Sequence, residues 1–298
     1  MKTVTDIAVM RELSRQVRGA GLRVGLVPTM GFLHEGHLEL VRRAKADADV
    51  VVVSIFVNPA QFNDPGDFEN YPRNTSADEA MLQAEGVDMM FVPEAEQVYP
   101  AGSASRVIVS GLADTLCGPG RPGHFDGVAT VVSALFNMVE PDFAVFGEKD
   151  YQQLQVIRRM AADLHFGVDV VSVATCREPD GVAMSTRNER LSAAERQQAP
   201  AIYRGLCLAS DAWQTGEDSS QALVGLVASE IEAAEGMTAE YVSLVDGATL
   251  QPVPRATAGC VLAVAAALGP VRLIDNVVLQ RTASAVTAAD KEETPAHA

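Results

Sequence analysis

Along the first 175 residues, short apolar runs alternate with longer stretches in which apolar residues recur at helical spacing. The run at residues 50–57 is apolar and β-branched, which is typical of a strand buried on both faces of a sheet. The pattern predicts strands at residues 23–27, 50–57, 87–92, 105–110, 142–147 and 168–175. It predicts helices at residues 36–48, 75–85, 126–139 and 148–164. This alternation favours an α/β fold with a mostly parallel, doubly wound sheet.

After residue 175 the pattern changes. Helical stretches cover residues 192–213 and 219–235, and Pro200 is expected to kink or restart the first of them. Strand-like runs follow at residues 241–245, 260–267 and 271–279, and a glycine–proline pair between the last two indicates an antiparallel hairpin. These elements predict a second, smaller α+β domain.

The chain is therefore predicted to have three parts. Residues 1–175 form the doubly wound domain, and residues 176–281 form the smaller domain. The boundary falls in the loop at residues 177–188, which contains a Pro-Asp-Gly turn signal. Residues 282–298 are rich in alanine and threonine with mixed charges, which predicts a disordered tail.

The composition argues against nucleic acid and membranes as binding partners. Acidic residues outnumber basic ones by 39 to 23, giving a formal net charge of −16, which repels nucleic acid phosphates. The longest apolar runs are too short to span a membrane, and residues 1–23 lack the apolar stretch of a signal peptide. We expect a cytoplasmic protein with no nucleic acid or membrane partner. An anionic substrate would need local cations, so each Lys, Arg and His near a predicted site is informative.

The clearest chemical signal lies in residues 28–37, where the first long strand turns into a helix. Gly31 and Gly36 would allow close backbone approach to a ligand, and a helix N-terminus favours phosphate. His34 and His37 are three residues apart and share a helix face, so they could stabilise charge on a phosphoryl group. Metal binding and a purely structural role are the alternatives for this histidine pair.

Four further motifs carry polar groups at strand ends or in glycine-containing loops. Residues 146–153 enter a helix after a strand, so Lys149 could bind phosphate and Gln153 would face the same side. Hydroxyls beside an arginine at residues 184–188 suit a triphosphate. In residues 54–62, an apolar strand ends and is followed by the polar residues Asn58 and Gln61. In residues 118–127, Arg121 lies in a glycine–proline loop. Each motif alone could equally be a solvated turn or a connector.

Together, the motifs resemble a known family. The His-x-Gly-His turn and the later Met-Ser-Thr-Arg loop are similar to the nucleotidyl-transferring superfamily that includes class I aminoacyl-tRNA synthetases. Five longer strings occur in order between Pro28 and Asn188 and resemble the pantoate–β-alanine ligase family. They are Pro-Thr-Met-Gly-x-Leu-His-x-Gly-His, Phe-Val-Asn-Pro-x-Gln-Phe, Arg-Pro-Gly-His-Phe-x-Gly-Val, Phe-Gly-Glu-Lys-Asp-Tyr-Gln-Gln and Met-Ser-x-Arg-Asn.

The resemblance implies a Rossmann-like ATP- and pantoate-binding domain, a C-terminal lid domain, a homodimer, and ATP with Mg²⁺. It implies catalytic roles for His37, His34 and Lys149, with His37 the catalytic acid. It implies substrate binding by Gln61, Gln153, Asn58 and Arg121. The implied ATP site comprises Met30, Gly31, Phe32, Leu33, His34, Glu35, Gly36, His37, Gly147, Glu148, Lys149, Asp150, Cys176, Met184, Ser185, Thr186 and Arg187.

The magnesium site is matched less well. Asp78 aligns best with the acidic residues implicated in the family, and Ala77 stands where a neighbouring acid is found. The implied reaction is attack of the pantoate carboxylate on the α-phosphorus of ATP, then attack of β-alanine on the acyl adenylate, with release of pyrophosphate and AMP. Two rival functions stay open from sequence: an adenylyl- or cytidylyltransferase whose product keeps the nucleotide, and a nucleotide-binding module without catalysis.

Overall fold

The computed structural model describes residues 1–63 and 65–281, and the chain divides into two compact units. The first unit comprises Met1–Arg177 and Met184–Thr186, and the second comprises Glu178–Ala183 and the residues from Arg187 onward. The predicted disordered tail at residues 282–298 lies outside the described residues. Within the described part of the chain, no helix is both long and apolar enough to cross a membrane.

The first unit is built on a six-stranded sheet in the order β1-β4-β3-β2-β5-β6, and every pairing is parallel. The strand order reverses beside β2, because β3 and β4 extend to one side of it and β5 and β6 to the other. In open α/β sheets, ligands bind at the carboxyl ends of the strands at such a reversal. The strands are β1 (Lys2–Val4), β2 (Val24–Thr29), β3 (Val50–Ile55), β4 (Met89–Phe91), β5 (Phe143–Gly147) and β6 (Asp169–Val173).

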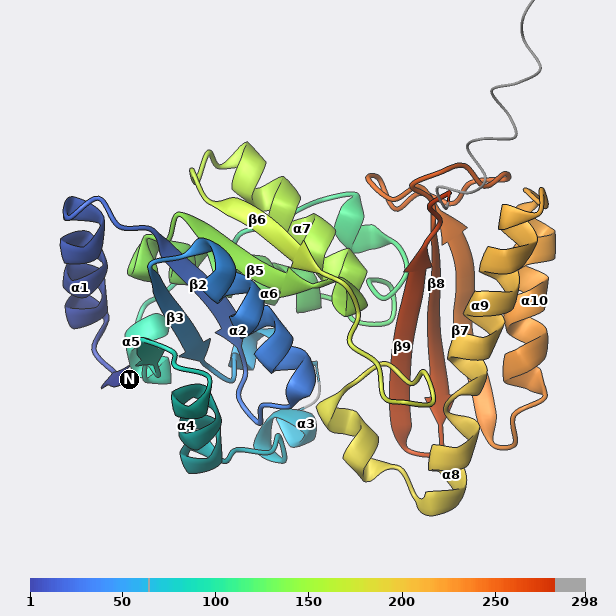
Figure 1. Cartoon of the computed structure of the whole chain (residues 1–298), viewed down its shortest axis with the longest axis horizontal. Helices are drawn as coiled ribbons and strands as arrows, with labels where there is room; N and C mark the ends of the chain where they lie inside the picture. Colours follow the sequence, from blue (N-terminus) through green and yellow to red (C-terminus); the bar gives the residue numbers. More distant parts are fainter. Residues whose placement is uncertain (64, 282–298) are drawn as a thin grey trace, which may run out of the picture. The chain divides into compact units, whose positions relative to one another are not determined.

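Helices cover both faces of this sheet, as the doubly wound prediction requires. On one face, α2 (Glu35–Asp47) packs against β2, β3 and β5 (Figure 1). Buried side chains of α2 and alternate residues of β3 form one apolar cluster there, so the other β3 residues point to the opposite face. The opposite face carries α1 (Ile7–Gly19), α6 (His124–Val139) and α7 (Tyr151–Asp163), with α6 packed against the other two.

Short elements connect these layers. The helices are α3 (Pro65–Glu69), α4 (Thr75–Ala84) and α5 (Ala95–Val98). The described residues of the first unit also form the 3₁₀ turns η1 (Pro59–Gln61), η2 (Leu112–Asp114) and η3 (Glu148–Asp150), and η4 (Thr186–Arg190) begins at its last residue. Of these turns, η1 and η3 follow the carboxyl ends of β3 and β5, so they carry the sequence motifs to one edge of the sheet.

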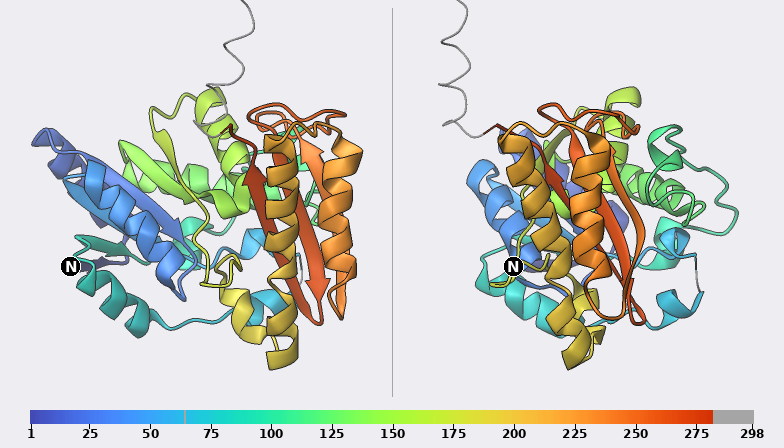
Figure 2. Two further views of the ribbon diagram at one scale, coloured as in Figure 1. Left: turned by 45° about the vertical axis from the view of Figure 1, so that its right-hand side comes forward. Right: turned by 90° about the vertical axis from the view of Figure 1, so that its right-hand side faces the viewer.

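The second unit has an antiparallel sheet of β7 (Met237–Val245), β8 (Val261–Leu268) and β9 (Val271–Val278). Helices α9 (Ala201–Gln214) and α10 (Ser220–Glu232) pack together on one face of it, as the two views of Figure 2 show. The predicted hairpin is confirmed, since Leu268 pairs with Val271 across its turn. The predicted restart at Pro200 is also confirmed, because α8 (Ala193–Gln198) ends just before it and α9 begins just after.

One local prediction fails, and two elements were not predicted. The strand expected at residues 105–110 is wrong, because these residues form no strand and the Val107 N–H donates instead to the Thr130 hydroxyl of α6 (2.9 Å). The short apolar run at residues 107–109 therefore belongs to a loop, in which Val109 is buried and Ile108 is exposed. Helix α1 and strand β1 were not predicted; α1 is capped by Asp6, whose carboxylate accepts from the Val9 N–H.

Candidate active site

The turn that follows β2 has an unusual backbone. Gly31 (φ 80°) and Phe32 (φ 51°) are both left-handed, a conformation that disfavours side chains with a Cβ. A Cβ at position 31 would lie 2.9 Å from both Asp78 Oδ2 and Ile55 Cγ2. Glycine is therefore required at position 31, and Phe32 needs outside support to keep its conformation.

That support comes from Asp78 on α4. Its carboxylate is only 2% exposed and accepts two backbone N–H groups of the turn, one per oxygen: Phe32 to Oδ2 (2.9 Å) and Leu33 to Oδ1 (2.8 Å). A charged acceptor bonded to two amides is a strong brace. Thr29 adds a bond on the other side, since its hydroxyl accepts from the Gly31 N–H (3.2 Å).

The two predicted histidines lie together at the N-terminus of α2, with ring centroids 4.1 Å apart. Nδ1 of His34 accepts from the Gly36 N–H (3.1 Å), and Nδ1 of His37 accepts from the His34 N–H (3.3 Å). Because a backbone N–H can only donate, neither Nδ1 carries a proton, and the neutral rings are protonated at Nε2. Both imidazoles can thus donate from Nε2 at the positive end of a helix.

Burial, aided by the neighbouring His34 and Lys149 and opposed by Asp150, lowers the pKa of His37 to about 3. His37 is therefore a neutral hydrogen-bond donor at neutral pH in the ligand-free protein. A bound polyanion would raise this pKa again, because opposite charge favours the imidazolium. This tuning suits a group that responds to charge arriving on a ligand.

Lys149 is delivered by β5, the strand on the other side of the order reversal. It lies in η3, directly after Gly147, and its side chain is 19% exposed. Its Nζ lies 3.9 Å from the Asp150 carboxylate. Glu148 turns toward β6, where it accepts from the Ser172 hydroxyl (2.9 Å). Strands β2 and β5 thus bring the histidines and the lysine to the same edge of the sheet.

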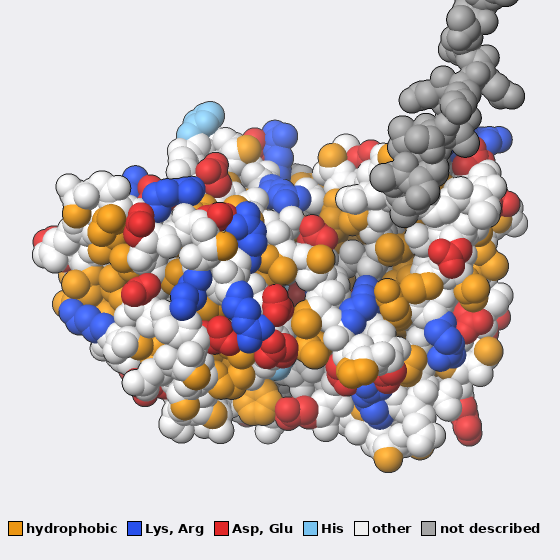
Figure 3. Space-filling view, viewed as in Figure 1, with side chains coloured by type: hydrophobic (Ala, Val, Ile, Leu, Met, Phe, Trp, Pro, Cys, Tyr) orange, Lys and Arg blue, Asp and Glu red, His pale blue; other side chains and the backbone are white. Residues whose placement is uncertain are grey.

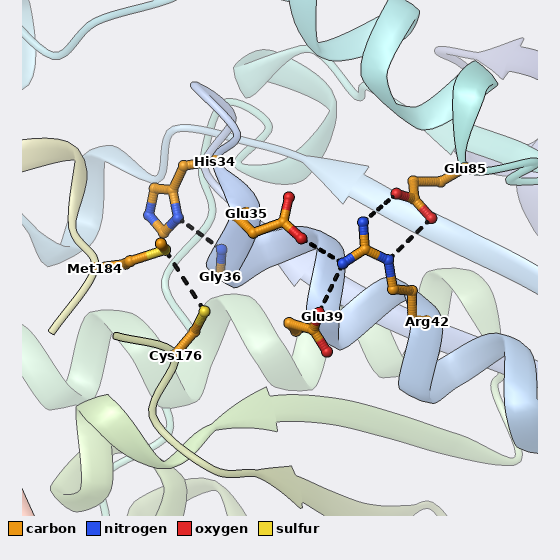
Figure 4. A network of polar contacts seen from close by, with 8 residues as sticks. All are labelled: His34, Glu35, Gly36, Glu39, Arg42, Glu85, Cys176 and Met184. Atoms are coloured by element: carbon orange, nitrogen blue, oxygen red, sulfur yellow. Dashed lines mark hydrogen bonds and ion pairs between the residues drawn. The ribbon is translucent and has the colours of Figure 1, made fainter. Parts of the chain in front are cut away.

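The acidic side chain inside the histidine motif is turned away from this edge. Glu35 pairs with Arg42, which also binds Glu39 and Glu85 (Figure 4). These carboxylates raise the pKa of Arg42 and are neutralised in part by it. On the face seen in Figure 3, basic side chains are likewise interspersed with acidic ones. The Glu35 carboxylate is therefore committed to Arg42.

The polar residues after β3 form a connected group. Asn58 is 1% exposed and donates from Nδ2 to Oε1 of Gln61 (3.0 Å) and to the Gly127 carbonyl (3.0 Å). Gln61 in turn donates from Nε2 to Sδ of Met30 (3.0 Å), a residue of the β2 turn. The buried Asn58 holds Gln61, so Gln61 is the member of the pair that can meet a ligand.

Adjacent glutamines on α7 have different surroundings. Gln152 is buried and bonds the loop ahead of Arg121: it accepts from the Cys117 N–H and donates to the carbonyls of Leu112 and Thr115. Gln153 is half-buried on the same first turn of α7. Gln152 therefore positions the loop, and Gln153 remains the candidate ligand-binding residue.

The loop after β6 lies beside the start of α2. A Cβ at Gly36 would lie 3.6 Å from Cβ of Cys176, and the Met184 N–H donates to the Cys176 carbonyl (3.0 Å). The two sulfur atoms of Cys176 and Met184 are 3.5 Å apart, and Figure 4 shows them next to His34. Cys176 and residues 184–186 are thus parts of the first unit, whereas Arg187 belongs to the second unit.

The predicted magnesium ligand does not fit a metal. Both oxygens of Asp78 already accept backbone N–H groups, and the carboxylate is buried. Among the described residues, no group of three or more His, Cys, Asp and Glu side chains is arranged to hold a metal ion. We therefore assign Asp78 to the support of the β2 turn.

Some supporting residues were not found from the sequence. Tyr99 donates to Asn58, and His124 donates from Nδ1 to the Gln61 carbonyl (2.8 Å). His124 lies in the Arg-Pro-Gly-His-Phe string, which was the available signal for it. Tyr99 had no signal, since it reaches Asn58 from 41 residues away.

Fold and site together define a nucleotide-binding α/β enzyme with imidazole and ammonium groups placed for phosphate at the reversal of strand order. A profile of the family described as pantoate-beta-alanine ligase matches residues 2–278. The chain is 49% identical over 281 residues to a pantothenate synthetase of Chromohalobacter salexigens, covering 94% of this chain and 99% of that protein. The chain belongs to the pantoate–β-alanine ligase family, as its motifs predicted.

Other relatives agree. The chain is 46% identical over 280 residues to a pantothenate synthetase of Moorella thermoacetica, covering 94% and 99% of the two chains. A crystal structure of the Thermus thermophilus pantothenate synthetase superposes with a TM-score of 0.88 at 44% identity, covering 94% of this chain and all of that one. A crystal structure of the Francisella tularensis pantoate-beta-alanine ligase, complexed with beta-gamma ATP and beta-alanine, superposes with a TM-score of 0.76 at 33% identity, covering 93% of this chain and 97% of that one.

Proposed function

We propose that this enzyme joins pantoate to β-alanine at the expense of ATP, through a pantoyl adenylate, and releases pyrophosphate and AMP. The observation that carries the proposal is the pair of imidazoles at the start of α2, both with Nδ1 bonded to the backbone and Nε2 as donor. Together with Lys149 they form a cationic and donor-rich edge in a chain of net charge −16. Such an edge suits a triphosphate.

In the first step, the pantoate carboxylate attacks the α-phosphorus of ATP and pyrophosphate leaves. Negative charge builds on the phosphoryl oxygens, and His34, His37 and Lys149 stabilise it there. The negative charge of the triphosphate favours the imidazolium form of His37, and this imidazolium can then also act as an acid. The backbone around the β2 turn, the β5 turn, Cys176 and residues 184–187 holds the rest of the nucleotide.

Pantoate is proposed to lie against Gln61 and Gln153. A nucleophilic carboxylate should not be neutralised by a tight ion pair, and neutral amides orient it without removing its charge. Asn58 acts behind Gln61, and Arg121 completes the substrate side. The β-alanine amine then attacks the mixed anhydride and AMP leaves. No covalent enzyme intermediate is required.

Magnesium is proposed to enter as a complex with ATP. Mg²⁺ commonly keeps several waters and binds through substrate phosphates, which is compatible with an Asp78 carboxylate that is committed to the backbone. The remaining assignments follow from the family. The first unit corresponds to the predicted ATP and pantoate domain, the second unit acts as the lid domain, and the enzyme works as a cytoplasmic homodimer.

The direct test is product analysis with purified protein. Incubation with Mg-ATP, pantoate and β-alanine should yield AMP, pyrophosphate and an amide in equal amounts, and omission of pantoate should abolish AMP release. A nucleotide adduct as the final product would favour the transferase alternative. Binding of ATP without turnover would favour a non-catalytic module.

The Asp78→Asn variant tests the brace on the β2 turn. Asparagine has one carbonyl oxygen, so one of the two turn N–H groups should lose its acceptor, at a cost of about 1–3 kcal/mol in the free energy of unfolding. The shifted turn should misplace the histidines and slow AMP release by about 10–100-fold. Denaturant unfolding and the AMP assay measure the two effects.

The matched control is Asp88→Asn, because Asp88 accepts one backbone N–H, that of Val51, at the opposite end of β3. This variant should keep normal turnover. The concentration of Mg²⁺ that gives half-maximal activity should stay the same in Asp78→Asn, and a large rise in it would mark Asp78 as a metal ligand instead.

A further inference from the structure

A chain of hydrogen bonds leads from Tyr99 to the amide of Gln61. The Tyr99 hydroxyl lies 2.7 Å from Oδ1 of Asn58, and Nδ2 of Asn58 lies 3.0 Å from Oε1 of Gln61. Tyr99 follows α5, and its ring packs 6.3 Å from that of Phe56 at the end of β3. Tyr99 itself does not belong to the motifs that identify the family, although Phe56 and Asn58 do.

The partners of Asn58 fix which way round its amide lies. Its oxygen receives two donors, the Tyr99 hydroxyl and the Ala60 N–H (3.2 Å). Its nitrogen faces two acceptors, Gln61 Oε1 and the Gly127 carbonyl. A rotated Asn58 amide would place donor against donor and acceptor against acceptor, which costs free energy in a buried site.

The direction of the Asn58 amide then fixes that of Gln61. Because Asn58 donates to it, Oε1 of Gln61 is used inside the protein, and Nε2 lies on the other side, where it reaches Sδ of Met30. The backbone of Gln61 is held as well, by His124 at its carbonyl and by close packing of α6: a Cβ at Gly127 would lie 2.3 Å from the Ala60 carbonyl oxygen.

We infer that Tyr99 is a positioning residue that sets the direction of the Gln61 amide, so that Gln61 presents an N–H donor rather than a carbonyl oxygen to its substrate. The inference rests on the proposed function, in which that substrate is pantoate. An N–H donor selects a ligand with an acceptor at this point, such as a carboxylate or hydroxyl oxygen. A reversed amide would set its own oxygen against the carboxylate and repel it.

The Tyr99 hydroxyl is suited to this role. Burial raises the pKa of Tyr99 to about 12, so the hydroxyl stays protonated and keeps donating throughout the usual assay range. The Tyr99→Phe variant keeps the ring and its packing on Phe56 and removes only the hydroxyl that donates to Asn58. Asn58 then loses one of the two donors to its oxygen and keeps only the Ala60 N–H, so its rotated form costs less free energy and Gln61 presents its oxygen for part of the time.

The expected result for Tyr99→Phe is a rise of about tenfold or more in KM for pantoate, at the scale of a hydrogen bond to a charged group. KM for ATP and for β-alanine should not change, and the melting temperature should stay close to that of the wild type. Tyr203→Phe, in the second unit, is the matched control and should leave all three KM values unchanged.

A double-mutant cycle separates this role from a general structural one. If Tyr99 acts through Gln61, then adding Tyr99→Phe to a Gln61→Ala variant should cause no further loss. An additive effect, or an equal rise in KM for ATP, would overturn the inference.

The same assays distinguish the positioning role of Tyr99 from the proposed function. Wild-type enzyme that releases AMP in a pantoate-dependent manner, together with a Tyr99→Phe variant of normal pantoate KM, would overturn this inference alone. Wild-type enzyme that does not respond to pantoate would overturn the proposed function and the inference with it.

Discussion

Replacing His37 by alanine is expected to slow adenylate formation by about 10²–10³-fold, the usual loss for one donor to a developing negative charge. The variant removes an Nε2–H that points from the start of α2 and whose ring is fixed by the bond from the His34 N–H. ATP binding should weaken less than the rate falls, because the charge develops mainly in the transition state. Single-turnover kinetics with pantoate and Mg-ATP measure the effect.

Two amide variants sharpen this test. His37→Asn can keep the acceptor for the His34 N–H but does not reach the position of Nε2, whereas His37→Gln extends an N–H toward that position. The glutamine variant should therefore lose less activity than the asparagine variant. Equal activity of both with the wild type would remove His37 from the mechanism, and a reversed order would mean that the capping bond matters more than the donor.

Replacing Lys149 by alanine is expected to have an effect of the same order, about 10²–10³-fold in rate, with a higher KM for ATP. Its ammonium group is the cation that β5 contributes to the phosphate edge, and its side chain is 19% exposed. Removing it takes away one of the cations proposed to balance the phosphate charge. Steady-state kinetics with varied ATP, at saturating pantoate, separate the KM and rate terms.

Two controls accompany the lysine variant. Lys149→Arg keeps the charge but has a different shape, so it should retain part of the activity. Lys45→Ala removes a lysine from the last turn of α2, where it bonds the Glu85 carbonyl, and should leave turnover unchanged. If Lys149→Ala behaved like Lys45→Ala, the phosphate role of Lys149 would be wrong.

The parts of the site that could be predicted from the sequence are local. His34 and His37 are three residues apart on one helix, and Lys149 follows a strand directly, so spacing and strand ends were sufficient to group them. The fold class was predictable for the same reason, since the strand and helix periods alternate over short distances. The spacing of these residues does not identify the substrates, which were inferred from the family resemblance.

The supporting contacts could not be predicted, because they join residues distant in sequence. Asp78 braces amides 45 and 46 residues earlier, Tyr99 reaches back 41 residues, and Gln152 bonds a loop 35 to 40 residues before it. Asp78 is an example: the family resemblance suggested a magnesium ligand, whereas each of its two oxygens accepts a backbone N–H. Which polar group a buried carboxylate meets depends on tertiary packing.

The central claim is that an acyl adenylate forms before the amine takes part, and isotope exchange tests it most directly. Enzyme, Mg-ATP and pantoate should exchange labelled pyrophosphate into ATP in the absence of β-alanine, because a reversible first step returns label to the nucleotide. Gln153→Ala should suppress this exchange by misplacing the carboxylate. A concerted reaction, or a route through an acyl phosphate and ADP, gives no such exchange. Enzyme that makes the amide but shows no pantoate-dependent exchange would therefore contradict the adenylate mechanism.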